Sequence, residues 1–152
     1  MTTEFNLENT LGYLINRCAI MLKNDLTRRF HQAGYEITPE EWAILNRLWE
    51  RDGMSQNELA ERTVKDKTTI TRFLNQMENK GLIKRHSSQT DGRSKNVQLT
   101  AEGQQLEPVL IQIAMGLLTE AATGLSATDI QITFSTLEKL ENNLVNIEKA
   151  NN

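Results

Sequence analysis

The sequence predicts a mainly α-helical fold with one small β-hairpin, on the evidence of composition, periodicity and turn signals. The 152 residues include only 2 Pro and 8 Gly, and aromatic residues make up 5%. This balance favours helices over a β-sandwich. Apolar residues make up 38%, enough for a globular core. The length is that of one average domain, so we expect one domain over residues 1–152. No apolar run approaches the roughly 18 residues of a membrane-spanning helix, so we expect no membrane partner.

Two amphipathic helices are expected in the first third of the chain. In residues 6–33, leucines recur at three- and four-residue steps, the spacing of one helical face. A second helix is expected to start at Pro39, because Thr38 and Glu41 form a capping box around a proline at the first helical position. Asp52 and Gly53 are expected to end it.

The middle of the chain predicts two short helices followed by a hairpin. Ser55 and Glu58 form a second capping box, and after a turn at residues 64–66 a helix is expected from Lys67 to Lys80. The β-prone stretches 82–87 and 94–99 flank a polar loop with an Asp-Gly turn signal, which predicts a hairpin. Two further helices are expected within residues 101–150.

Two short helices joined by a three-residue turn and followed by a hairpin make a winged helix-turn-helix. We expect this lobe at residues 36–100. The outer segments 6–33 and 101–150 carry apolar stripes that so small a lobe cannot cover. They are therefore interpreted as dimerisation helices of a homodimer. The alternative is a helical bundle within one chain.

The charge distribution is uneven along the chain. The formal net charge is −3, yet residues 62–95 hold nine basic and three acidic side chains. A basic surface on an acidic body suits a nucleic-acid partner. Taken alone, such clustering is equally typical of an ordinary solvated surface.

The fourth expected helix has a polar face suited to double-stranded DNA. At 100° per residue, Thr68, Arg72 and Gln76 lie opposite an apolar side. Arginine can donate to guanine, glutamine can pair with adenine, and threonine offers a hydroxyl and a methyl group. In the hairpin, Arg93 can enter a minor groove and Arg85 can bind phosphate. The alternatives are a solvated helix face and basic residues that only solubilise a turn.

Six ordered segments resemble the signature of the multiple antibiotic resistance regulator (MarR) family over about residues 10–147. They are Ile37–Leu45, Glu58–Ala60, Thr68–Arg72, Glu78–Arg85, Asp91–Arg93 and Val97–Gly103. The resemblance implies a homodimeric repressor or activator that binds pseudo-palindromic promoter DNA and is often released by a small ligand. It also implies that residues 67–80 form the recognition helix and that Asp91 belongs to a wing motif.

Together these arguments give a set of expected DNA-contacting residues. They are Lys65, Lys67, Thr68, Thr69, Thr71, Arg72, Gln76, Arg85, Asp91, Arg93 and Lys95.

A small effector and a redox sensor are two further hypotheses. Tyr13, Arg17, Trp42 and Arg47 pair aromatic rings with guanidinium groups, which suits a carboxylated aromatic ligand. Ordinary packing or surface charge is the alternative for each. Cys18, the lone cysteine, lies in the first apolar stripe. We expect it to be packed in the core, and the alternative is a redox-sensing regulator of the same fold.

Other classes of function lack support in the sequence. His31 and His86 lie in different elements, so we expect no metal site and no cofactor. The sequence contains no glycine-rich phosphate loop and no recognisable nucleophile–histidine signature, so we expect no enzyme. The N-terminus has no secretory pattern, which favours the cytoplasm. A winged helix that binds another protein instead of DNA remains an alternative.

Overall fold

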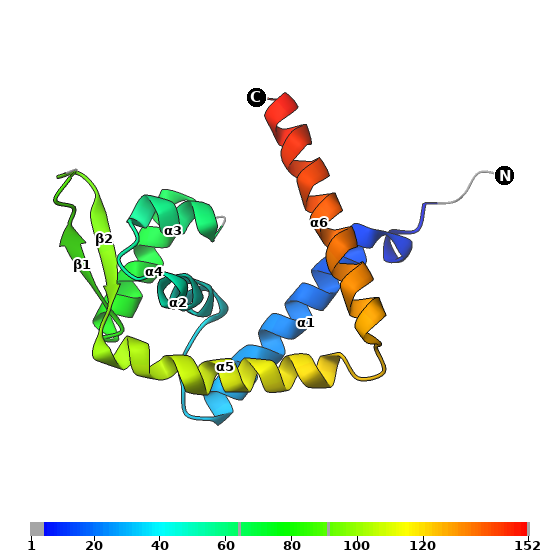
Figure 1. Cartoon of the computed structure of the whole chain (residues 1–152), viewed down its shortest axis with the longest axis horizontal. Coiled ribbons are helices and arrows are strands. Elements are labelled where there is room, and N and C mark those ends of the chain that lie inside the picture. Colours follow the sequence, from blue (N-terminus) through cyan, green and yellow to red (C-terminus); the bar gives the residue numbers. More distant parts are fainter. Residues whose placement is uncertain (1–4, 64, 91, 152) are drawn as a thin grey trace. The chain divides into compact units, whose positions relative to one another are not determined.

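The computed structural model describes residues 5–63, 65–90 and 92–151, and it confirms a mainly helical chain with one two-stranded hairpin (Figure 1). The chain divides into two compact units, Met1–Leu117 and Leu118–Asn152. In order, the elements are the 3-10 helix Leu7–Asn9, α1 (Leu11–Gln32), α2 (Pro39–Glu50), α3 (Gln56–Arg62), α4 (Lys67–Asn79), β1 (Ile83–Ser87), β2 (Lys95–Leu99), α5 (Ala101–Ala121) and α6 (Ala127–Ala150).

The predicted caps fix most helix starts. The capping box of Thr38 and Glu41 opens α2, and the backbone N–H of Gly103 donates to the Thr100 hydroxyl at 3.1 Å at the start of α5. The box expected at Ser55 is only half formed. Its hydroxyl accepts from the Glu58 backbone, but the Glu58 carboxylate pairs with Arg51.

The N-terminal helix differs from the prediction of one helix over residues 6–33. A 3-10 turn at Leu7–Asn9 comes first, and α1 begins at Leu11. The physical reason is the Thr10 side chain, which accepts the backbone N–H of Tyr13 at 3.3 Å and caps a new helix. Leucine periodicity cannot reveal this break, because it continues through both segments.

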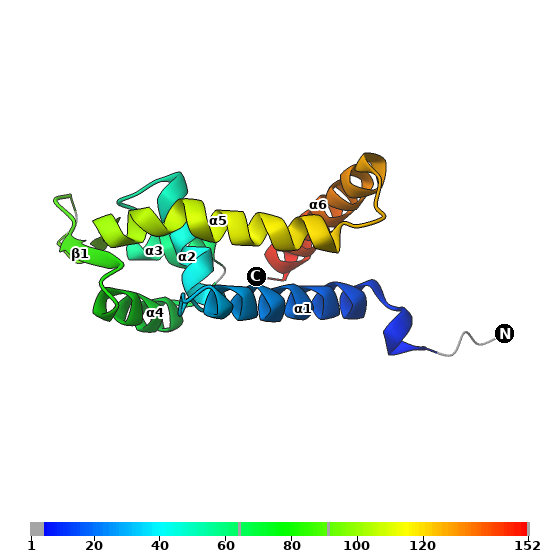
Figure 2. The ribbon, with the colours of Figure 1, turned by 90° about the horizontal axis from the view of Figure 1, so that it is seen from below.

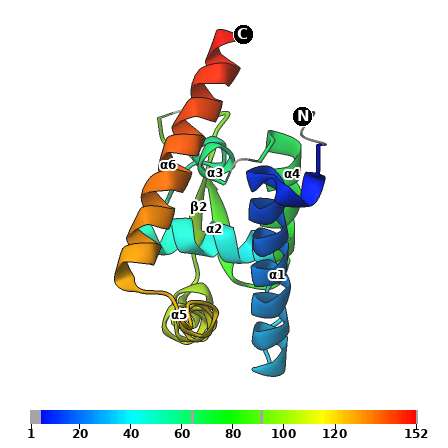
Figure 3. The same cartoon turned by 90° about the vertical axis from the view of Figure 1, so that its right-hand side faces the viewer.

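The core of the first unit lies among α2, α3, α4, the hairpin and α5. Figure 1 and Figure 3 both show α2 between α3 and α5, with α5 seen almost along its axis in Figure 3. Six apolar side chains are completely buried there: Leu45, Leu59, Leu74, Met77, Val97 and Leu110. This packing buries one face of α4 and leaves the other face outside.

Aromatic packing joins α1 and α5 to this core. Phe30 of α1 packs on Trp42, whose ring contacts that of Trp49 with centroids 5.8 Å apart. The Trp49 indole donates to the backbone oxygen of Gly103 at 3.0 Å. A Cβ at Gly103 would lie 2.2 Å from the Leu82 oxygen, so only glycine allows α5 this close to the hairpin. Figure 2 shows α5 as a long rod from the base of the hairpin.

The hairpin is antiparallel, and its register runs from Ile83 opposite Leu99 to Ser87 opposite Lys95. β2 also bonds to the segment before α3, where the Val97 N–H donates to the Met54 oxygen at 2.8 Å. The base of the hairpin is thereby fixed to the helical core.

Apolar side chains are exposed on α1 and, in the second unit, on α6. The α1 set is Leu11, Leu14, Ile15, Ile20, Met21 and Leu22, and the α6 set is Ile130, Ile132, Phe134, Leu137, Leu144, Val145 and Ile147. Among the described residues, no helix has the length and apolar content needed to cross a membrane.

Candidate nucleic-acid interface

The start of α4 is fixed by its N-cap, Asp66. One carboxylate oxygen accepts the backbone N–H of Thr69 at 2.8 Å, and the other accepts its hydroxyl at 2.6 Å. These hydrogen bonds lower the pKa of Asp66 below its usual range, and the bond from the Thr69 hydroxyl has the largest effect. Because Ile70 and Leu74 are buried in the core, the cap and the core together determine which face of α4 meets solvent.

The predicted polar face of α4 does lie outside. The side chains of Lys67, Thr68, Arg72 and Gln76 are exposed. The Arg72 guanidinium lies 5.0 Å from the centroid of the Phe73 ring, within the range of a cation–π contact. The face therefore offers donors and acceptors over more than two helical turns.

Two threonines at the edge of this face, and Lys65 in the preceding turn, are half-buried. The Thr71 hydroxyl donates to the Lys67 backbone oxygen at 2.8 Å, and that of Thr69 is used by the cap. Thr69 and Thr71 can therefore contact a partner through their methyl groups and through the remaining lone pairs of their hydroxyl oxygens.

An open cavity of about 210 Å³ lies where α3, α4 and the hairpin meet. It brings together four of the predicted residues, Thr71, Arg85, Arg93 and Lys95. The other lining residues are Gln56, Asn57 and Ser94. A concave site with three cationic side chains and several amide or hydroxyl groups suits a phosphate oxygen.

The Arg85 guanidinium is engaged by other residues of the chain and is not freely available to a phosphate. Its side chain is only 13% exposed, and its guanidinium donates to the Glu78 carboxylate at 2.6 Å. It also donates to Asn75 at 2.6 Å and to Gln56 at 3.5 Å. The hydrogen bonds from Arg85 are the largest cause that lowers the pKa of Glu78, with a smaller contribution from the charge of Lys95.

Three polar residues near this surface were not predicted from the sequence: Asn75, Gln56 and Asn57. Asn75 is exposed on α4, and the two α3 residues line the cavity. The 100° rotation per residue places Asn75 beside Thr68 and Thr71 on the polar face, so the same helical periodicity could have identified it. The α3 residues depend on how the hairpin folds back, which periodicity does not show. Asp91 lies outside the described residues.

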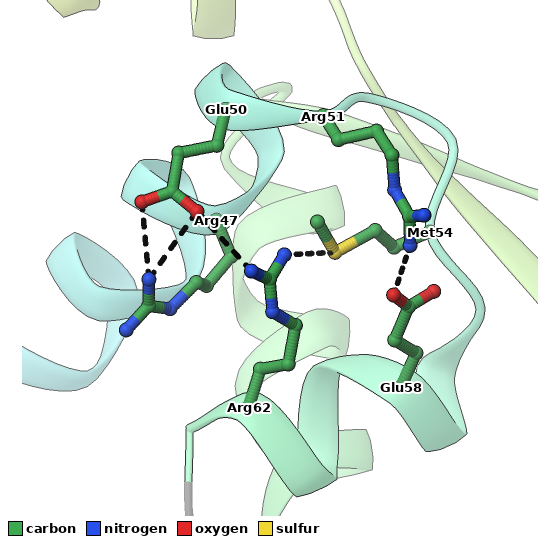
Figure 4. A network of polar contacts seen from close by, with 6 residues as sticks. All are labelled: Arg47, Glu50, Arg51, Met54, Glu58 and Arg62. Carbon is green, nitrogen blue, oxygen red and sulfur yellow. Dashed lines mark hydrogen bonds and ion pairs between the residues drawn. The ribbon is translucent and has the colours of Figure 1, made fainter.

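A second open cavity, of about 420 Å³, lies between α2 and α3 and contains two of the four predicted effector residues. Trp42 and Arg47 line it together with Ala43, Asn46, Glu50, Arg62 and Thr63. Figure 4 shows Glu50 between two guanidinium groups: Arg47 approaches to 3.0 Å and Arg62 to 3.6 Å. The half-buried Tyr13 and the exposed Arg17 lie on α1 and are absent from the lining residues of this cavity.

Cys18 is exposed on α1, so the expectation of a packed core cysteine is wrong for the single chain. The apolar stripe that contains it faces outward. Within residues 5–63, 65–90 and 92–151, no group of three metal-ligating side chains comes together.

Comparisons with known proteins agree with this architecture. Residues 37–95 match the model of the MarR family. The transcriptional regulator HosA of Escherichia coli O127:H6 (strain E2348/69 / EPEC) is 29% identical over 116 residues, which are 76% of this chain and 86% of HosA.

Two solved structures share the fold. The transcriptional repressor CouR bound to a 23-mer DNA duplex has a TM-score of 0.80 and 21% identity, covering 91% of this chain and 99% of CouR. The PcaV regulator from Streptomyces coelicolor, in complex with its natural ligand, has a TM-score of 0.77 and 21% identity, covering 93% of this chain and 98% of PcaV. With the family signature in residues 37–95 and a winged helix built around it, this chain resembles the MarR family of transcriptional regulators in both sequence and fold.

Proposed function

We propose that the protein is a homodimeric transcriptional repressor that binds pseudo-palindromic promoter DNA in the cytoplasm. The observation that carries the proposal is the orientation of α4: its apolar face is buried and its Asp66 cap is formed, so Arg72 and Gln76 are presented outward. A helix with this exposed face fits the major groove. CouR, which has the same fold, was solved on DNA.

The hairpin and the cavity beside it extend the contact from bases to backbone. Arg93 and Lys95 line the cavity between α3, α4 and the hairpin, and phosphate oxygens of the same duplex would lie there when α4 enters the groove. Phosphate contacts set affinity and register, while the α4 side chains select bases. Arg72 is thus proposed to read a base and Arg93 to bind the backbone.

The exposed apolar faces of α1 and α6 support a dimer. Leu11 and Leu14 on α1 and Phe134 and Leu144 on α6 are each more than 45% exposed in the single chain. Continuous apolar stripes of this kind mark interaction surfaces in proteins. Two copies of α4, related by a two-fold axis, would read two half-sites of a palindrome.

Replacing Arg72 by Ala tests the recognition helix. We expect the affinity for the preferred site to fall by about 1 to 3 kcal/mol, because one bidentate base contact is lost. The melting temperature should be unchanged, since Arg72 is exposed. Fluorescence anisotropy measures the affinity for the labelled preferred site (the operator) and, separately, the affinity for scrambled DNA.

Arg28→Ala is the matched control, because it removes the same charge from α1, outside the winged-helix lobe. It should leave operator affinity at the wild-type value. Equal affinities of Arg72→Ala and wild type for the operator would contradict the assignment of α4 as the recognition helix.

We also propose that a small carboxylated aromatic ligand loosens the DNA complex. The supporting observation is the cavity between α2 and α3, where an indole and two guanidinium groups meet. Arginine suits a carboxylate and tryptophan an aromatic ring. PcaV, a relative in fold, was solved with its natural ligand. A ligand releases DNA only if it binds the two conformations of the regulator with different affinity.

Titration with benzoate and salicylate tests this proposal. Millimolar acid should raise the melting temperature and weaken operator binding, and Arg47→Ala should reduce both effects. Arg51→Ala is the control, because Arg51 pairs with Glu58 and is not a lining residue of the cavity. No shift in melting or in DNA binding would exclude this ligand class.

A further inference from the structure

The geometry points to Arg85 as a positioning residue that fixes the base-reading surface of α4, in particular the side chain of Asn75, instead of binding DNA phosphate. This inference rests on the proposed DNA-binding function.

Arg85 joins three elements through one half-buried guanidinium. It extends from β1 to Glu78 and Asn75 on α4 and to Gln56 on α3. The Glu78 carboxylate also accepts the backbone N–H of Arg85 at 3.2 Å, so both the side chain and the strand are held to the helix. A planar group with fixed donor directions holds such a junction more rigidly than a lysine can.

The Arg85 guanidinium is already ion-paired and hydrogen-bonded within the chain. Its side chain is 13% exposed, and its Nε and Nη2 both donate to the same Glu78 oxygen, at 3.1 and 2.6 Å. Binding a phosphate would require breaking a short charge-assisted pair. Lys95, which lines the same cavity, is exposed and can meet phosphate at lower cost.

The contact with Asn75 has a consequence for specificity. A guanidinium only donates hydrogen bonds, so the Asn75 amide presents its oxygen to Arg85 at 2.6 Å and its NH₂ group to solvent. Asparagine needs both its oxygen and its nitrogen to pair with adenine. Held in this way, exposed Asn75 has its oxygen turned toward Arg85 and its NH₂ group available, so it favours acceptors such as O6 and N7 of guanine or O4 of thymine.

The experiment compares Arg85→Lys, Glu78→Gln, Asn75→Ala and the wild type on operator DNA, on single-base operator variants and on scrambled DNA. Arg85→Lys and Glu78→Gln should each lower operator affinity about tenfold, with no change for scrambled DNA. Both should weaken discrimination at the base pair that Asn75→Ala also affects. The double variant Arg85→Lys/Glu78→Gln should be no weaker than either single variant, because both break one junction.

The salt dependence separates positioning from direct contact. Arg85→Ala should retain the wild-type slope of log affinity against log salt, whereas loss of a phosphate contact lowers the slope by about 0.9. Glu78→Gln is the decisive variant, because it releases the Arg85 cation. If Arg85 binds phosphate, this variant binds all DNA as well as or better than wild type, and the inference fails.

Amide hydrogen exchange without DNA distinguishes failure of this inference from failure of the proposed function. Arg85→Lys and Glu78→Gln should speed exchange in β1 and the end of α4, while Lys84→Gln, an exposed neighbour on β1, should not. Unchanged exchange in the two junction variants overturns the inference, whatever the DNA results. Faster exchange in a protein that selects no DNA retains the junction and rejects the proposed function.

Discussion

Glu41 is the one charged side chain in the described part of the chain that is completely buried. Its Oε2 accepts from the Thr38 N–H at 3.0 Å and from Lys80 Nζ at 2.8 Å, and its Oε1 has no hydrogen-bond partner within the described residues. Lys80 also donates to the Glu36 backbone oxygen at 2.8 Å. One lysine at the C-terminal end of α4 thus holds the segment that joins α1 to α2.

Lys80→Met should therefore destabilise the fold. The substitution leaves the buried Glu41 carboxylate without its cation, which costs about 1 to 3 kcal/mol of unfolding free energy. Urea denaturation measures this loss. Lys84→Met, at an exposed position on β1, is the control and should stay within about 0.5 kcal/mol of wild type. Equal unfolding free energies for the two variants would show that the Glu41–Lys80 pair contributes nothing.

Residue roles were harder to predict from sequence than residue faces. Arg72 and Gln76 lie on the expected outer face because helical rotation alone fixes it. The hydrogen bonds from Arg85 to α3 and α4 could not be predicted, because their acceptors lie 7 to 29 residues away in sequence. Cys18 was expected in the core because it shares a helix face with the leucines of α1. An apolar stripe shows which residues share a face, but it does not show whether the same chain covers that face.

At the scale of elements, local signals explain most of the fold. Capping residues and positive-φ glycines end or begin helices through backbone hydrogen bonds, which depend on neighbours in the sequence. Asp66 and Gly81 accordingly bound α4 as predicted, with φ of 72° at Gly81. The 3-10 turn before α1 and the half-formed box at Ser55 were missed. The box at Ser55 is half-formed because Arg51, seven residues before Glu58, pairs with the Glu58 carboxylate.

Local sequence patterns do not predict the long-range packing between elements. No periodicity indicates that α5 must approach the hairpin at Gly103, or that β2 bonds to residue Met54 before α3. The bond from β2 to Met54 holds the hairpin beside the start of α3, so Gln56 and Asn57 could be assigned to the cavity only from the structure.

At the scale of the whole molecule, the exposed apolar faces predict that one chain is not the working unit. Leu144→Glu on α6 should shift a dimer to monomer, because a buried carboxylate at an apolar interface is costly. Asn146→Glu, half a turn away, is the control and should remain dimeric. Sedimentation velocity measures both. A dimeric Leu144→Glu variant would place the α6 stripe outside the interface.

Binding-site selection from a random pool of duplex DNA tests the central claim, that paired α4 helices read promoter DNA, most directly. The wild-type protein should enrich a pseudo-palindrome whose half-site centres lie about 10 base pairs apart, since two recognition helices must enter successive major grooves. Enrichment of no sequence, or of a single asymmetric site bound by one chain, would contradict the proposed function.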